Sequence, residues 1–136
     1  MISLARFTLY GLSGWCLEVL WTGLGSLLAG DARLTAQTYL WMFPIYGVVV
    51  FLEPVHDRIA DWPWPVRGLL WMAIFFGIEY LTGWIIRLAV GQSPWNYSQA
   101  PWHLHGLIRL DYAPVWFGAG FVFERFHAYL QQKGIS

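Results

Sequence analysis

The sequence has little charge and a single cysteine. Charged residues make up 12% of the chain, eight basic against eight acidic, and the formal net charge is zero. A water-soluble surface usually carries about 25–35% charged residues, so an ordinary soluble domain is excluded. Cys16 alone cannot form an internal disulfide. The balanced charge provides no basic surface, and we expect no nucleic-acid partner.

Hydrophobic residues take the place of the missing charge, at 57% of the chain. A membrane helix needs about 20 mainly apolar residues, and four stretches reach this length, roughly residues 2–28, 39–60, 66–90 and 107–130. The ten tryptophans and seven tyrosines cluster near the ends of these stretches, which is typical of aromatic belts at the membrane interface. The sequence therefore predicts an all-α integral membrane protein with four transmembrane helices, forming a single domain over residues 1–136.

The basic residues predict the orientation in the membrane. Four spans place both termini and the central connection on one side, and this side carries more arginine and lysine than the other. Under the positive-inside rule the termini are cytoplasmic. We expect the protein to lie in the lipid bilayer of a bacterial inner (plasma) membrane. A homo-oligomer is the candidate assembly.

The chain resembles a duplicated helical hairpin, with halves at about 1–60 and 62–131. When the sequence is shifted against itself by 61 positions, Arg6 aligns with Arg67 and Glu18 with Glu79. A shift of 71 positions aligns Glu53 with Glu124. The connection "GQSPWNYSQAPWHLHG" is the longest and has no Lys, Arg, Asp or Glu. Its aromatic character predicts a loop that is partly interfacial or re-entrant.

Each predicted helix contains one glutamate, at positions 18, 53, 79 and 124. The midpoint between the two glutamates of each hairpin falls inside its connecting loop, which predicts that all four lie at one level. Four carboxylates that converge in an apolar medium need protons, arginines or a metal to neutralise them. Arg87 follows Glu79 on roughly the same face and is the expected counter-charge.

Two histidines leave an alternative open. His56 follows Glu53, and His127 follows Glu124, by three residues, so each pair shares a helix face. Glutamates on two helices with Glu-x-x-His on the other two are the ligand pattern of di-iron and di-manganese four-helix proteins. The alternative is a membrane-embedded oxidoreductase that binds two iron or manganese ions through Glu18, Glu53, His56, Glu79, Glu124 and His127.

A third hypothesis assigns no chemistry to the glutamates. Buried glutamates often pair with arginines, and Arg58, Arg87, Arg109 and Arg125 lie within reach along the sequence. The protein would then be a non-catalytic membrane assembly subunit. The chain contains no phosphate-binding loop, so we expect no ATPase activity.

Several motifs in order along the chain resemble one family. These are "CLEVLWTG", "IYG" followed by Glu53, "EYLTGWIIR", "PWNYS" and "GLIRLDYAPVWF". Together they are similar to the small membrane proteins of the ABC-transporter type IV, or CmpB-like, family, which includes the transmembrane protein 229 group. The family pattern covers the four glutamates but neither histidine.

The resemblance implies an integral membrane protein with a role in transport. It adds Tyr46 and Tyr112 to the site and marks the loop residues Pro94, Trp95, Tyr97 and Ser98 as a lid or interfacial anchor. The main hypothesis is therefore a transporter or permease-like protein that handles a small cation, proton or polar solute at an intramembrane carboxylate cluster. The predicted site comprises Glu18, Glu53, Glu79, Glu124, Arg87, Tyr46 and Tyr112.

Overall fold

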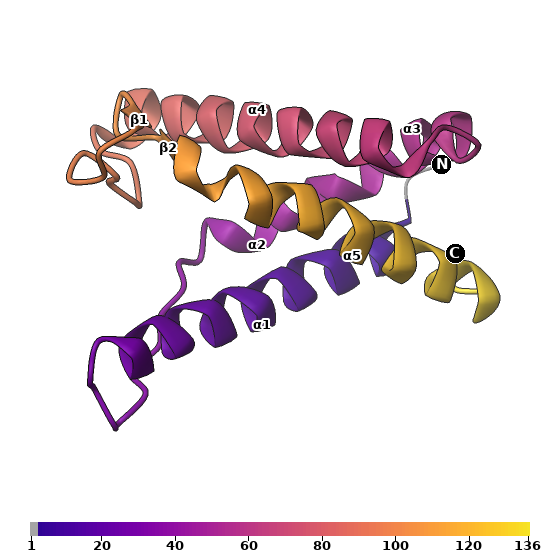
Figure 1. The fold of residues 1–136 in the computed structure, drawn as a ribbon. Coiled ribbons are helices and arrows are strands. Elements are labelled where there is room, and N and C mark those ends of the chain that lie inside the picture. Colours follow the sequence, from indigo (N-terminus) through magenta and orange to yellow (C-terminus); the bar gives the residue numbers. More distant parts are fainter. Residues whose placement is uncertain (1–2) are drawn as a thin grey trace. The chain divides into compact units, whose positions relative to one another are not determined.

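A computed structural model describes residues 3–136, and the fold is helical apart from one small hairpin. Ile2, where the first predicted span begins, lies outside the described residues. The elements in chain order are α1 (Leu4–Leu28), α2 (Met42–Gly47), η1 (Val48–Leu52), α3 (Glu53–Ile59), α4 (Trp64–Val90), β1 (His103–Leu104), β2 (Ile108–Arg109), η2 (Leu110–Tyr112) and α5 (Ala113–Gln132) (Figure 1).

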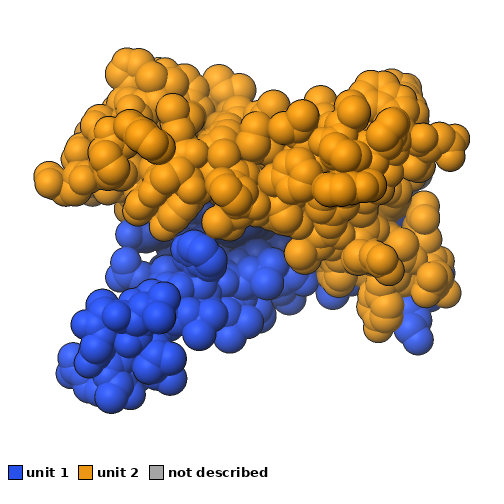
Figure 2. Space-filling view, in the orientation of Figure 1, with its two compact units in different colours: residues 1–55, 133–136 blue, residues 56–132 orange. Residues whose placement is uncertain are grey.

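The chain divides into two compact units, coloured separately in Figure 2. The first runs as far as Val55 and includes Lys133–Ser136. The second is His56–Gln132. The boundary lies within α3, close to the division between the predicted repeat halves; the repeat and the single-domain organisation stay predictions. Each unit is described by itself below.

In the first unit, α1 packs against the helical segment that follows it. The Ser3 hydroxyl accepts a hydrogen bond from the Arg6 amide at 3.1 Å, which caps the start of α1. A Cβ atom added at Gly14 would lie 2.0 Å from the Tyr46 ring, and one at Gly47 would lie 2.6 Å from the Phe7 ring. Glycine at these two positions therefore allows the helices to approach closely.

The second helical segment is continuous but not uniform. The elements α2, η1 and α3 follow one another without a gap, and η1 is a 3₁₀ helix. Pro54 has no amide to donate to the carbonyl of Val50, and this carbonyl accepts instead from the amide of Glu53. Glu53 is helical, with φ −55° and ψ −47°. The tighter turn before Pro54 thus preserves helical geometry at Glu53, although a following proline usually disfavours it.

In the second unit, α4 and α5 run antiparallel side by side (Figure 1). Pro65 stands in the first turn of α4, where no intrahelical amide is required, and Gly91 ends the helix with φ 89°. A Cβ atom at Gly120 would lie 2.3 Å from Cβ of Trp71. This contact places the middle of α5 directly against the buried Trp71 of α4.

The third connection folds back onto α4. Strands β1 and β2 pair antiparallel, with His103 opposite Arg109, and the turn uses His105 and Gly106 at positive φ. The Trp95 indole donates to the Leu107 carbonyl at 2.8 Å, and both side chains are buried. A Cβ atom at Gly83 would lie 2.8 Å from the Leu107 side chain and 3.2 Å from the Trp95 ring. The loop therefore covers the last turns of α4 rather than extending away from them.

The membrane spans are confirmed in part. Within the described residues, α4 is the one helix both long and apolar enough to cross a membrane. The elements α2, η1 and α3 are each too short, and α1 and α5 are less apolar on average than α4. The all-helical fold is confirmed, whereas four transmembrane helices remain a prediction.

Candidate functional site

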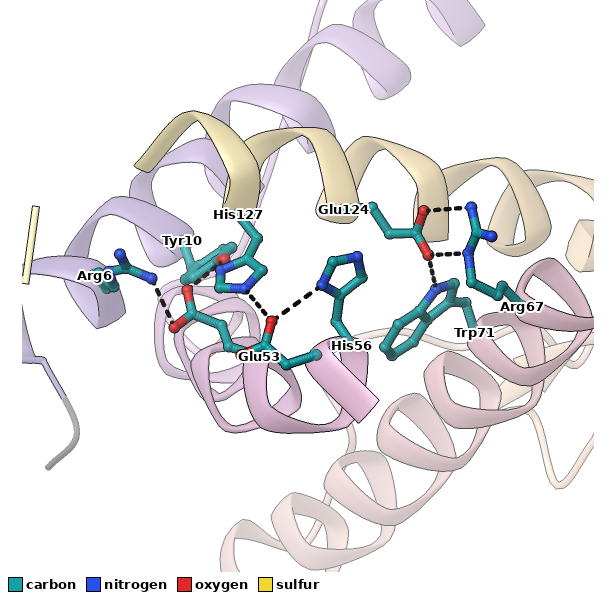
Figure 3. Close-up of polar contacts among 9 residues, drawn as sticks. Arg6, Tyr10, Glu53, His56, Arg67, Trp71, Glu124 and His127 are labelled. Atoms are coloured by element: carbon teal, nitrogen blue, oxygen red, sulfur yellow. Dashed lines mark hydrogen bonds and ion pairs between the residues drawn. The ribbon is translucent and has the colours of Figure 1, made fainter. Parts of the chain in front are cut away.

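Glu53 is held by two residues of α1. Arg6 Nη1 lies 2.9 Å from Glu53 Oε2, and the Tyr10 hydroxyl donates to Oε1 at 2.8 Å (Figure 3). Both members of the ion pair have side chains that are 13% exposed. Arg6 Nε also donates to the Ile135 carbonyl at 2.7 Å, so the guanidinium is fixed from two directions. This arrangement neutralises Glu53 and joins α1 to α3.

Glu124 is held in the same manner within the second unit. Arg67 donates through Nε to Oε1 at 2.9 Å and through Nη2 to Oε2 at 3.2 Å, which makes the pair bidentate. The Trp71 indole donates to Oε1 at 2.9 Å (Figure 3). Trp71 is fully buried, so its N–H needs this acceptor.

The two arrangements use equivalent sequence positions. Arg67 follows Arg6, and Trp71 follows Tyr10, by the 61 positions that relate the two predicted halves. Glu124 follows Glu53 by the 71 positions of the second relation. In both units an arginine and an aromatic donor one turn later bind the glutamate. Neither Arg6 nor Arg67 was expected to bind a glutamate, although the pairing of these two arginines in the predicted repeat could have indicated it.

Glu18 has a neutral donor. The Tyr46 hydroxyl donates to Glu18 Oε2 at 3.0 Å, across the close approach at Gly14. Tyr46 was predicted as a site residue through the family pattern, and the structure places it against the predicted glutamate. A phenol stabilises a carboxylate by hydrogen bonding but does not cancel its charge.

The connection after α1 returns along the helix near Glu18. The Thr22 hydroxyl donates to the Gln37 carbonyl at 3.0 Å and accepts from the Gln37 amide at 2.9 Å. The Ser26 hydroxyl donates to the Thr35 carbonyl. At the exposed tip, a hydrogen bond from the Thr35 side chain lowers the pKa of Asp31 below its usual range. Hydroxyl groups on α1 thus attach this connection to the helix.

Glu79 is held by the third connection and by α5. The Tyr97 hydroxyl donates to Oε1 at 3.0 Å, and the Trp116 indole donates to Oε2 at 3.2 Å. Glu79 is 8% exposed. Two neutral aromatic donors therefore contact the two oxygens of a buried carboxylate, and one of them comes from the predicted loop motif.

Arg87 contacts the loop. Its Nη2 donates to the His105 carbonyl at 3.0 Å and lies 3.4 Å from the Ser93 hydroxyl, and its guanidinium lies over the Trp84 ring. Ser93 in turn donates to the Trp95 carbonyl at 2.7 Å. These contacts give Arg87 a part in holding the loop on α4, whereas it was expected to balance the charge of the glutamates.

The remaining loop residues surround Tyr97. The Tyr97 and Tyr112 rings meet edge to face, with centroids 6.0 Å apart, and Arg109 lies over Tyr112. The Ser98 amide donates to the Asn96 side chain at 2.9 Å, which closes a turn after Pro94 and Trp95. Tyr112 thus contacts the loop residue that binds Glu79.

The prediction that the glutamates share one level is wrong within each unit. Glu53 is bound by Tyr10, which precedes Glu18 by eight residues on α1, about 12 Å along the axis. Glu124 is bound by Trp71, which precedes Glu79 by the same interval on α4. The contact of Gly14 with Tyr46 shows that the first hairpin turns near residue 30, about five residues before the midpoint of its glutamates.

The two histidines meet at a third residue. His127 Nε2 lies 3.0 Å from Asp57 Oδ1. His56 Nδ1 lies 3.4 Å from the same oxygen atom (Figure 3, where Asp57 has no label). The predicted two-metal set joined these histidines to the glutamates, but the oxygens of Glu124 bind Arg67 and Trp71. Asp57 was missed because it follows His56 directly and has no counterpart in the repeat.

The comparison with protein families gives a match over nearly the whole chain. A family model described as "Putative ABC-transporter type IV" matches residues 5–136. No solved structure matches the chain.

Proposed function

Since the chain belongs to the ABC-transporter type IV family, we propose that it is a membrane-embedded protein that handles a small cation, a proton or a polar solute. We further propose that Glu18 and Glu79 perform this role, whereas Glu53 and Glu124 stabilise the fold. The division rests on the chemistry of the groups that bind each carboxylate.

The distribution of apolar side chains supports the membrane location. Leu20 is 63% exposed on α1 and Leu88 is 80% exposed on α4, as are many other large apolar residues of these helices, whereas Glu79 is buried. A water-soluble protein rarely exposes apolar surface on this scale, but a lipid-facing helix requires it. We propose that all four helical segments span the bilayer.

The observation that carries the proposal is the contrast between the two pairs of glutamates. Arginine side chains bind Glu53 and Glu124 directly, and each guanidinium offsets the charge of its carboxylate. Phenol and indole groups donate hydrogen bonds to Glu18 and Glu79. A carboxylate with neutral donors can bind a cation or gain a proton with little rearrangement of its surroundings.

The third connection supplies access to the second of these sites. Tyr97 reaches Glu79 from a loop that is fixed on α4 by Trp95 and Arg87. If α4 spans the bilayer, this loop is re-entrant, because its backbone lies beside helical residues below the end of α4. We propose that opening and closing of the loop control the contact between Glu79 and the solvent.

Flux measurements in liposomes test the proposal. Purified protein is reconstituted with an internal pH-sensitive dye, and a potassium diffusion potential drives proton uptake; sodium and potassium uptake are measured in parallel. We expect flux in the wild type and its loss in Glu18→Gln and Glu79→Gln. The matched control is Asp31→Asn, which changes a half-buried carboxylate outside the helices. Equal flux in the control, the wild type and both glutamate variants would overturn the role of these carboxylates.

A second candidate is favoured by the ion pairs themselves. If the glutamates only stabilise the helices, the protein is a non-catalytic membrane assembly subunit. That candidate predicts no ion flux by the wild type in any gradient and a loss of folded protein when Arg6 or Arg67 is replaced. The same liposome experiment thus distinguishes the two.

A further inference from the structure

The cluster of His56, Asp57 and His127 lies wholly within the second unit. One ligand atom from each residue, a ring nitrogen or a carboxylate oxygen, lies within 4.8 Å of the other two. His56 and Asp57 are consecutive residues of α3, and His127 lies on α5. The cluster therefore joins the start of this unit to its last helix.

The spacing of these atoms is suited to a metal ion. In tetrahedral zinc sites the Zn–N and Zn–O distances are about 2.0–2.2 Å, which places neighbouring ligand atoms about 3.3–3.5 Å apart. The two distances to Asp57 Oδ1 are 3.0 Å and 3.4 Å. A divalent ion can thus replace the protons between these groups with small shifts of the side chains.

The rings are already oriented by their neighbours. Phe123 stacks on His127 with an interplanar angle of 11°, and His56 meets the edge of Phe123 at a centroid distance of 6.3 Å. The two imidazoles are themselves edge to face at 5.2 Å. Packing of this kind fixes the direction of the ring nitrogens before any ion binds, which favours binding.

Burial gives the cluster a closed side and an open side. His127 is 2% exposed, whereas the Asp57 side chain is 56% exposed. Three protein ligands with one side open to solvent are the arrangement of zinc sites that keep a position for water or another ligand. Two imidazoles and one carboxylate are a known ligand set of zinc sites that keep an open position.

We propose that His56 Nδ1, Asp57 Oδ1 and His127 Nε2 form a binding site for one Zn²⁺ ion. The site contains none of the carboxylates of the proposed function. It shares His56 and His127 with the predicted two-metal set but has Asp57 in place of the glutamates. The ion would connect α3 to α5 and leave its fourth position open on the side of Asp57.

Metal binding to the purified full chain tests the site. Protein in detergent is treated with a chelator, and binding of Zn²⁺ is then measured by calorimetry, with Co²⁺ absorption as a report of tetrahedral geometry. We expect about one ion per chain. Asp57→Asn and His56→Gln should each weaken binding at least about tenfold and remove the tetrahedral Co²⁺ spectrum.

The matched control is the double variant His103→Gln, His105→Gln, which removes the two histidines of the third connection. It should bind Zn²⁺ as the wild type does. The proposal is overturned if the wild type binds no more Zn²⁺ than Asp57→Asn, or if the loop variant loses the ion. Because the Asp57 side chain is largely exposed, Asp57→Asn is expected to fold. Its Zn²⁺ binding therefore tests the site even if His127 variants fail to fold.

Discussion

The Arg67 guanidinium binds both oxygens of Glu124, with Nε 2.9 Å from one and Nη2 3.2 Å from the other. The two side chains are 19% and 11% exposed, so water screens the pair weakly. Removal of one partner leaves a buried charge that nothing else in this contact neutralises.

Arg67→Ala should therefore lower the free energy of unfolding by about 3–5 kcal/mol. The double variant Arg67→Ala, Glu124→Gln should recover a large part of this loss, because a neutral amide needs no counter-ion. Thermal unfolding in detergent measures both. Arg125→Ala, an exposed arginine next to Glu124 on α5, is the control and should have little effect. Equal losses in the single and double variants would show that the pairing is unimportant.

The hydroxyl of Tyr10 can be tested separately from its ring. Tyr10 is 5% exposed and donates to Glu53 at 2.8 Å. Tyr10→Phe removes this donor and keeps the packing, so we expect a loss of about 1.5–3 kcal/mol, the usual range for a hydrogen bond to a charged group. Chemical unfolding of the variant in detergent provides the measurement, and an unchanged midpoint would contradict the bond.

Close helix packing predicts opposite effects for two neighbouring glycines of α5. A Cβ atom at Gly120 would lie 2.3 Å from Cβ of Trp71, whereas one at Gly118 meets nothing within 4 Å. Gly120→Ala should destabilise the protein by about 1–3 kcal/mol through overpacking. Gly118→Ala should be neutral or stabilise it by up to about 1 kcal/mol, because alanine favours the helix. Thermal unfolding of the pair tests this, and similar melting temperatures would contradict it.

The loop over Glu79 depends on the Trp95 anchor. Trp95→Ala removes the hydrogen bond to Leu107 and the packing on Gly83, so the loop should open and expose Glu79. Labelling with a water-soluble carbodiimide, read by mass spectrometry at Glu79, should increase several-fold. Trp102→Ala, which removes a tryptophan of the same loop that is 67% exposed, should leave the labelling unchanged. If both variants label Glu79 as the wild type does, Trp95 is not the anchor.

The helices could be predicted closely from the sequence. The apolar stretches at residues 66–90 and 2–28 nearly coincide with α4 and α1, because apolar length and flanking Gly and Pro determine where such helices begin and end. The stretch at 107–130 was placed too early, since its first residues form β2 and η2. Hydrophobicity alone does not distinguish a buried loop strand such as Ile108 from a helix.

The site residues named from the sequence stay a prediction. The structure gives the glutamates hydrogen-bonding partners, as expected of ionisable residues in apolar helices, and Tyr46 is the partner of Glu18. The pairing of Arg6 and Arg67 with glutamates was not predicted. The depth of a residue along a helical hairpin depends on where the chain turns, and the sequence does not specify that position. Asp57 could not be identified from helix faces, because consecutive residues such as His56 and Asp57 point about 100° apart. Only the tertiary fold brings both of them close to His127.

The 3₁₀ segment before Pro54 also changes the angular phase of its helix. Each 3₁₀ residue advances about 120° around the axis, against about 100° in an α-helix. Over the five residues Val48–Leu52 the accumulated difference is about 100°. The segment therefore shifts Glu53 around the axis relative to Tyr46, with which it would share a face in a uniform α-helix. Both side chains still contact α1, where Tyr46 binds Glu18 and Glu53 binds Arg6 and Tyr10.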